Sequence, residues 1–252
     1  MSEGFQLANL GAAQFALIGA VAFAASILGG LAGYGTGLVL PIFLAPAVGI
    51  ANVVPVMAVA MILNNGSRVA AFLRDIRWPY VWRVLVFGLP ACVAGAYGYT
   101  LLETRAVALL LGSFFIASVP LRRWLAHVGW QLGPRGVSVA GAGFGLVNGA
   151  MTGAGLLLIS TLMAAGIQGA GLIATDATVS VIMGLAKVAL FGGFARLDLQ
   201  LGAAGLLIGL ATVPGAFVAR WLLAHIPLRV HTVMMEFVVL AGGAGFLWRA
   251  FA

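Results

Sequence analysis

Long apolar runs separated by short polar segments dominate the pattern along the chain. No charged residue occurs between Glu3 and Arg68, nor between Arg135 and Asp176, although about 20 apolar residues are enough to cross a bilayer. Several runs exceed 20 residues and are expected to span with some tilt. The runs compatible with helices cover residues 9–33, 37–48, 51–73, 79–101, 104–121, 136–149, 154–166, 170–193, 199–223 and 229–250. The pattern predicts an all-α polytopic membrane protein.

Two of these runs, 37–48 and 154–166, are unusually short. Each holds about a dozen residues, or roughly 18 Å of helix, which is about half the thickness of a membrane. Each follows a glycine-rich stretch, residues 29–37 and 145–155 respectively. The sequence therefore predicts two half-length helices, broken or re-entrant, preceded by flexible backbone.

The two halves of the chain resemble each other. Residues 35–40 (GTGLVL) recur as 153–158 (GAGLLL), and residues 68–72 (RVAAF) recur as 187–191 (KVALF). Two dipeptides further along recur at a slightly larger offset. Matches in the same order, with one basic residue replacing another, indicate an internal duplication.

We expect two homologous transmembrane repeats, residues 1–125 and 126–252, within one integral membrane domain. If the half-length segments cross the bilayer, each repeat has an odd number of crossings and the second repeat is inverted. If they are re-entrant, each repeat has four crossings and the repeats are parallel. Arginine positions fit both arrangements. Inversion is preferred because it brings Arg68 and Lys187 towards one cavity from opposite sides.

Composition supports a membrane protein. The chain is 63% hydrophobic and 8% charged, whereas about a quarter of the residues in soluble domains are charged. The net charge of +7 resides in clusters, residues 68–83 and 122–135, between apolar runs. This is the positive-inside pattern, and not the basic patch of a nucleic-acid-binding protein. A multi-pass protein of a bacterial inner membrane is expected.

The two glycine-rich breaks are the candidate binding site. Irregular backbone at membrane depth occurs only inside protein or beside a cavity, and paired interrupted helices mark the binding sites of transporters. A helix that begins there directs free N–H groups and its positive dipole end at the site, which favours an anion. The candidate residues are Gly35, Thr36, Gly37, Asn148, Thr152, Gly153 and Gly155. Glycines spaced by four also suit a helix-packing face, and both roles are compatible.

Basic and amide side chains lie near the same depth. Lys187 is about seven residues from the end of its run, roughly 10 Å deep, and Arg68 is its repeat counterpart. Intramembrane charges are costly and usually functional, although both side chains have the reach to snorkel to the interface. Asn64 and Asn65 are further candidate ligands, whereas Asn52 is expected to cap a helix.

Asp176 has two interpretations. The first is a helix cap, because it lies near the start of its run. The second is a proton- or Na⁺-coupling group. Glu236 has no visible partner. No metal-ligand cluster, nucleophile–base pair or ATP-binding loop is evident, so we expect neither an enzyme nor a cofactor.

The glycine-rich motif resembles the TauE/SafE family of sulfite and organosulfonate exporters. The resemblance comprises residues 29–41 (GGLAGYGTGLVLP), the run from Ala51 to Arg68, the basic loop that follows, and residues 149–155 and 174–191 of the second half. Thr36 and Ala154 replace glycines that are common in the family.

The resemblance implies secondary transport, in the direction of export, of a small sulfur-containing anion such as sulfite, sulfoacetate or a related organosulfonate. The expected partners are this anion and membrane lipid, and a second copy of the chain in a homodimer is a further candidate. The alternative is an ion-coupled carrier or channel for a cation, with Asp176 at its centre.

Overall fold

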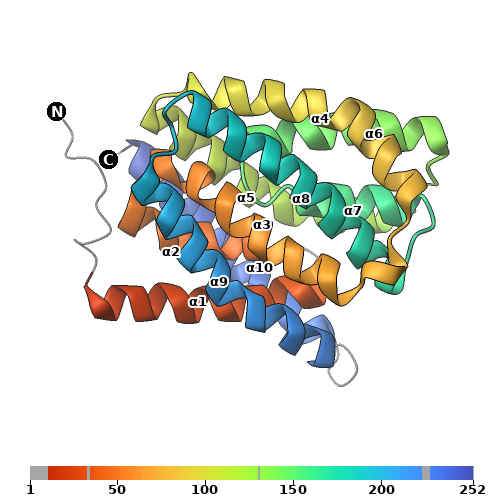
Figure 1. Cartoon of the computed structure of the whole chain (residues 1–252), viewed down its shortest axis with the longest axis horizontal. Helices are drawn as coiled ribbons and strands as arrows, with labels where there is room; N and C mark the ends of the chain where they lie inside the picture. Colours follow the sequence, from red (N-terminus) through yellow and green to blue (C-terminus); the bar gives the residue numbers. More distant parts are fainter. Residues whose placement is uncertain (1–10, 33–34, 130, 223–227, 252) are drawn as a thin grey trace.

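All regular elements that the structure describes are helices. The computed structural model describes residues 11–32, 35–129, 131–222 and 228–251, and Gly33 of the first glycine motif lies outside these ranges. The α-helices are α1 (Ala12–Ala32), α2 (Thr36–Val48), α3 (Val53–Ala71), α4 (Trp78–Thr100), α5 (Thr104–Val128), α6 (Pro134–Ala150), α7 (Gly155–Ala164), α8 (Gly169–Gly193), α9 (Leu199–Leu222) and α10 (Leu228–Phe251), with short 3₁₀ turns at Ile50–Asn52 and Leu73–Asp75 (Figure 1).

The predicted helical runs agree with these helices within about three residues, except at the end of α5. This helix continues to Val128, beyond the polar residues that were expected to end it. Arg122 and Arg123 in this extension both pair with Glu236 of α10, so the prediction that Glu236 lacks a partner was wrong. Because these partners are 114 and 113 residues away in the chain, local sequence carries no signal of them.

Five helices of the described residues are long and apolar enough to cross a membrane. They lie within Ile50–Ala71, Trp78–Thr100, Thr104–Leu125, Gly169–Gly193 and Leu199–Ala219. Large apolar side chains on their outer faces are exposed, among them Phe87, Leu207 and Phe217. Exposed apolar surface of this extent suits contact with lipid, and the predicted polytopic membrane fold is confirmed.

Helices α6 and α7 form a hairpin that returns to its starting end. The amide of Leu132, just before α6, donates to the carbonyl of Ala164 at the end of α7 (2.7 Å). The Tyr80 hydroxyl, near the start of α4, donates to the carbonyl of Ala165, which directly follows α7 (3.5 Å). Because Arg74 and Arg77 immediately precede α4, we call this the basic end of the bundle.

Helices α1 and α2 form a corresponding hairpin at the opposite, distal end. The Tyr99 hydroxyl at the end of α4 donates to the carbonyl of Ala51, just after α2 (2.9 Å). In Figure 1, α1 begins at the same end of the molecule as α9. Helices α3 to α5 and α8 to α10 then run from end to end.

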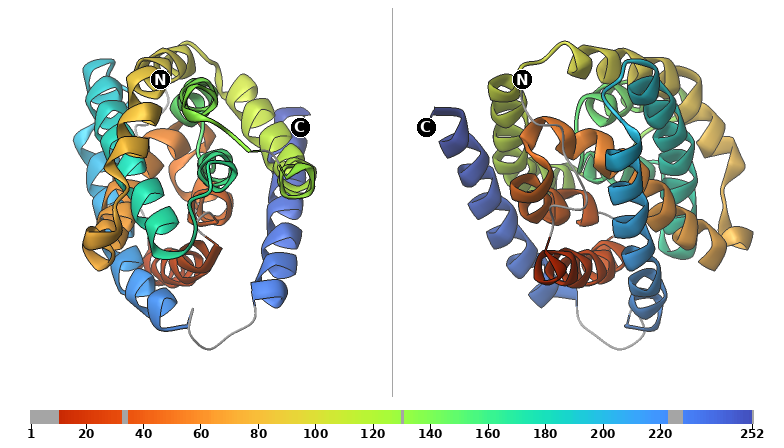
Figure 2. Two further views of the ribbon diagram at one scale, coloured as in Figure 1. Left: turned by 90° about the vertical axis from the view of Figure 1, so that its right-hand side faces the viewer. Right: turned by 60° about the vertical axis from the view of Figure 1, so that its left-hand side comes forward.

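Helix directions can be followed from their contacts. Helices α3 and α8 are antiparallel, since Arg68 lies beside Asp176 whereas Gly184 lies beside Ile62. Helices α5 and α10 are also antiparallel, with contacts from Gly112 to Gly243 at one level and from Arg122 to Glu236 at another. They lie side by side at one edge of the bundle (Figure 2).

The glycines spaced by four in α6 form a packing face against α4. Gly141 contacts Val84, Gly145 contacts Gly88, and Gly149 contacts Cys92. The packing interpretation is thus correct for this helix. This close packing against α4 brings the C-terminal end of α6 close to the centre of the molecule.

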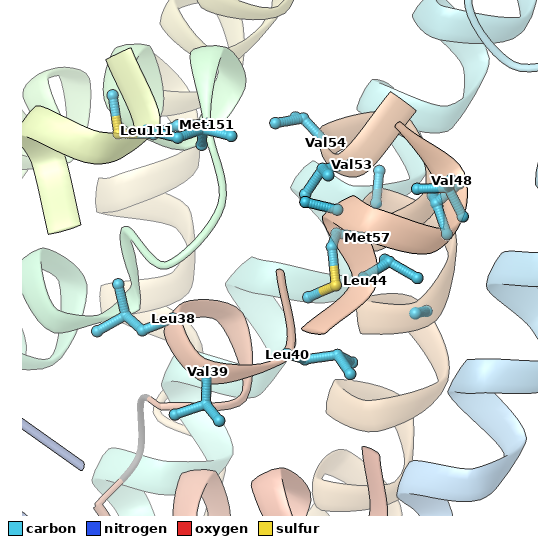
Figure 3. Close-up of a cluster of buried hydrophobic side chains, with 14 of the residues drawn as sticks. Leu38, Val39, Leu40, Leu44, Val48, Val53, Val54, Met57, Leu111 and Met151 are labelled. Carbon is cyan, nitrogen blue, oxygen red and sulfur yellow. The ribbon is translucent and has the colours of Figure 1, made fainter. Parts of the chain in front are cut away.

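The apolar core surrounds the short helix α2. Nine of its 13 residues are buried, and Leu44 lies beside Met57 of α3, whereas Leu38 projects from the other side of the helix (Figure 3). Helix α2 lacks an amphipathic pattern because other helices surround it on most sides. The half-length helix is therefore held inside protein, where its free N-terminal amides need partners.

Candidate functional site

One cavity lies where the two half-length helices begin. Its volume is about 70 Å³, and residues from both halves of the chain line it. The lining residues are Gly29, Gly35, Thr36, Gly37, Met57, Ala58, Met61, Asn64, Asn65, Arg68, Asn148, Thr152, Gly153, Ala154, Gly155, Asp176, Ser180, Gly184 and Lys187. All twelve residues predicted from the sequence as substrate-binding or coupling candidates are among them. Their part in binding remains a prediction.

The two breaks in the helices touch each other at this cavity. Gly35 precedes α2 with φ of 129°, and Gly153 precedes α7 with φ of 85°. Both conformations favour glycine because a Cβ would be strained there. The Thr152 hydroxyl donates to the carbonyl of Gly37 (2.9 Å). The starts of α2 and α7, both glycine-bounded, thus meet in the interior.

A buried ion pair crosses the cavity between the two halves. Arg68 Nη1 on α3 lies 3.4 Å from Asp176 Oδ2 on α8, and both side chains are at least 95% buried. The same Arg68 nitrogen donates to Asn65 Oδ1 (3.2 Å). Asp176 lies seven residues into α8 rather than at its first turn. The helix-cap interpretation of Asp176 was therefore wrong, because the long-range contact with Arg68 decides its environment.

Lys187 closes the broken end of α6. Its Nζ donates to the carbonyls of Asn148 (2.6 Å) and Met151 (3.1 Å). Carbonyls at the C-terminal end of a helix carry partial negative charge, which a cation stabilises. Lys187 is buried and does not snorkel to the interface. It therefore holds the break in place and presents its charge to the cavity.

Most of the other polar side chains are engaged within the protein. Thr36 donates to the carbonyl of Ala25 (3.0 Å), and Asn64 Oδ1 accepts from Ser26 (3.0 Å). Asn148 lies beside the sulfur atoms of Cys92 and Met183. The hydroxyl groups of Thr36 and Thr152 thus both donate to buried carbonyls.

Asn52 was expected to cap a helix, and it caps the end of the preceding helix α2 rather than the start of α3. It stands at the start of α3, but its side chain makes no capping bond there. Asn52 Nδ2 instead donates to the carbonyl of Val48 at the end of α2 (2.8 Å). The side chain satisfies the last turn of the half-length helix.

Sequence reasoning missed several lining residues that the repeat could have revealed. On α3 the lining positions include 57, 61, 65 and 68, and on α8 they are 176, 180, 184 and 187. Each position on α8 is the α3 position plus 119, the repeat offset. Met57, Met61, Ser180 and Gly184 could therefore have been found by extending the helical spacing from Arg68 and Lys187.

The electrostatics of the cavity favour an anion. Arg68 and Lys187 contribute two positive charges and Asp176 one negative charge, which gives a formal charge of +1 among the lining residues. Two helix N-termini add partial positive charge. Among the described residues, no group of three or more His, Cys, Asp or Glu could hold a metal ion.

Comparison with known proteins identifies the family. The chain matches the family described as Sulfite exporter TauE/SafE over residues 18–246, which includes every residue of the cavity. Neither the curated proteins nor the solved structures gave a match. This match and the predicted resemblance agree, and the chain belongs to the TauE/SafE sulfite exporter family, whose members are membrane transporters of sulfur-containing anions.

Proposed function

We propose that this protein is a secondary transporter that exports sulfite, sulfoacetate or a related organosulfonate across a bacterial inner membrane. The main observation behind this proposal is that the starts of α2 and α7 line the same buried cavity as the side chains of Arg68 and Lys187. A sulfonate or sulfite group offers three acceptor oxygens. Free amides at two helix starts and two cations are donors of the kind that bind such oxygens well.

Transport requires that the cavity open alternately to each side of the membrane. The proposed mechanism uses the two repeats, residues 1–125 and 126–252, as moving parts. Each contributes one hairpin and one cation to the cavity, and the hairpins enter from opposite ends of the bundle. Rocking of inverted repeats around a fixed central site is a general solution for secondary transport.

The positive-inside rule assigns the ends. Arg74, Arg77 and Arg135 lie at the basic end, which is therefore cytoplasmic in this proposal. Helices α6 and α7 then enter from the cytoplasm, and α1 and α2 enter from the periplasm. Outward transport would load the anion from the basic end.

Uptake of a radiolabelled organosulfonate into proteoliposomes tests the proposal. Lys187→Ala and Arg68→Ala should each lower affinity about tenfold or more, because each removes a charged donor. Lys187→Gln separates charge from structure, since an amide can still donate to the Asn148 and Met151 carbonyls. Arg135→Ala, at the exposed start of α6, is the control and should transport normally. Unchanged uptake in both cavity variants would refute this site.

A cation carrier is the second candidate. Asp176 favours it, because its Oδ1 is buried and has no hydrogen-bond partner among the described residues. This function predicts that Asp176→Asn abolishes transport whereas Lys187→Ala spares it. The anion transporter predicts the opposite order of sensitivity, so the same two variants distinguish the candidates.

A further inference from the structure

The charged residues of the cavity break the correspondence between the two halves. Arg68 corresponds to Lys187 at the repeat offset of 119, so the cations are paired. At the same offset Asp176 corresponds to Met57, which also lines the cavity. One half therefore supplies a carboxylate, and the other supplies a thioether at the equivalent place.

This asymmetry leaves the two cations in different environments. Asp176 lies 3.4 Å from Arg68 and compensates its charge. Lys187 is bound by the carbonyls of Asn148 and Met151, which carry no formal charge. No carboxylate of the described residues lies within ion-pairing distance of Lys187. The cavity thus keeps one uncompensated positive charge.

From this balance we infer that Asp176 determines the charge of the transported anion and makes the cavity select monoanions over dianions. The inference rests on the proposed anion transport and narrows its substrate class to monovalent sulfonates and hydrogen sulfite. Sulfoacetate, which carries both a sulfonate and a carboxylate, is then disfavoured as a dianion. A monoanion neutralises the formal charge of +1, whereas a dianion leaves a net negative charge in a buried site. Uncompensated charge in a poorly solvated interior is strongly unfavourable.

The position of the Asp176 carboxylate supports this role. Asp176 is 2% exposed, and its Oδ1 has no hydrogen-bond partner among the described residues. Its charge is therefore only partly screened from a ligand in the cavity. At a separation of several ångströms, repulsion of a second ligand charge amounts to about tenfold or more in affinity.

Methanesulfonate and sulfate make a suitable pair of probes, because both present tetrahedral sulfur with oxygen ligands and they differ by one charge. In proteoliposomes containing the wild-type protein, methanesulfonate should compete with a labelled monovalent organosulfonate about tenfold better than sulfate. Equal competition by the two probes would overturn the inference even though organosulfonate transport itself had been observed.

The decisive variant is Asp176→Asn, which keeps the shape of the side chain and raises the cavity charge to +2. The ratio of sulfate to methanesulfonate affinity should rise about tenfold or more. Asp75→Asn removes an exposed acid that does not line the cavity and is the matched control. An unchanged ratio in Asp176→Asn would overturn the inference.

A double variant separates charge from folding. Arg68→Gln with Asp176→Asn restores the charge of +1 and avoids an unpaired buried arginine. Its preference for methanesulfonate should return to that of the wild type, although its absolute affinity falls. A preference for sulfate in this variant would contradict selection by charge. Absence of uptake of any sulfur oxyanion by the wild-type protein would instead refute the proposed function.

Discussion

Lys187 is the sole lysine of the chain, and its amine has two tasks in the structure. It satisfies two carbonyls at the end of α6, and it lines the cavity. A lysine suits this place because its three donors can serve carbonyls and an anion together. The depth of Lys187 could be estimated from the sequence, but not the carbonyls it binds.

An amine-reactive reagent provides a direct test of whether the anion contacts this residue. Only Lys187 and the N-terminal amine can react. Bound organosulfonate should slow modification of Lys187 several-fold, because it covers the amine and holds it protonated. The N-terminal amine in the same molecule is the control, and mass spectrometry measures both sites. Equal rates at Lys187 with and without the anion would contradict contact.

The ion pair of Arg68 and Asp176 should behave as a buried pair in stability measurements. Removal of one partner, as in Asp176→Ala, is expected to cost about 3–5 kcal/mol because a charge is left uncompensated in the interior. Replacement of both residues, as in Arg68→Met with Asp176→Leu, should cost less than either single change. Thermal unfolding in detergent measures these differences. A double change that costs as much as the sum of the two single changes would show that the pair is not coupled.

At the scale of the helices, glycine decides how closely the elements approach. Gly145 of α6 packs against Gly88 of α4, and Gly37 at the start of α2 meets Gly153 before α7. The sequence indicated both uses of glycine without assigning them. Assignment required the positions of the opposing backbones, since spacing by four occurs at packing faces and at breaks alike.

Two alanine substitutions in the same helix test the contact of α4 with α6. A Cβ at Gly145 would overlap the carbonyl oxygen of Gly88, whereas a Cβ at Gly143 meets nothing within 4 Å. Gly145→Ala should lower stability by about 1–3 kcal/mol through overpacking. Gly143→Ala should raise it by about 0.5–1 kcal/mol, because alanine loses less backbone entropy in a helix. Thermal unfolding in detergent is the measurement, and similar stability of both variants would contradict the packing.

For the whole molecule, helix directions bear on how the halves are related. Corresponding helices α3 and α8 are antiparallel, as are α5 and α10. Helices of one half also pack against helices of the other half, since α4 packs with α6 and α1 packs with α9. These relations support the proposal of two inverted repeats, in which three end-to-end helices follow each hairpin. Because each repeat would then cross the membrane an odd number of times, the second repeat would start on the opposite side and be inverted.

Inverted repeats place equivalent loops on opposite sides of the membrane. We expect Arg74→Cys, after α3, and Leu199→Cys, after α8, to react from different sides. Both positions are exposed, and Cys92→Ser removes the natural thiol. In sealed vesicles a membrane-impermeant maleimide should label only one of the two, and both after permeabilisation. Labelling of both from one side would contradict inversion.

The membrane class, the positions of the helices and their breaks, and twelve of the residues that line the cavity follow from the sequence alone, because apolar run length and glycine clusters are local properties. The family followed from the same motifs and was confirmed. Three contacts became evident only from the folded arrangement: Asp176 pairs with Arg68, Lys187 binds the end of α6, and Glu236 has two arginine partners. Each of these contacts joins residues more than 30 positions apart, and a buried charge is stabilised by whichever partner the fold brings to it.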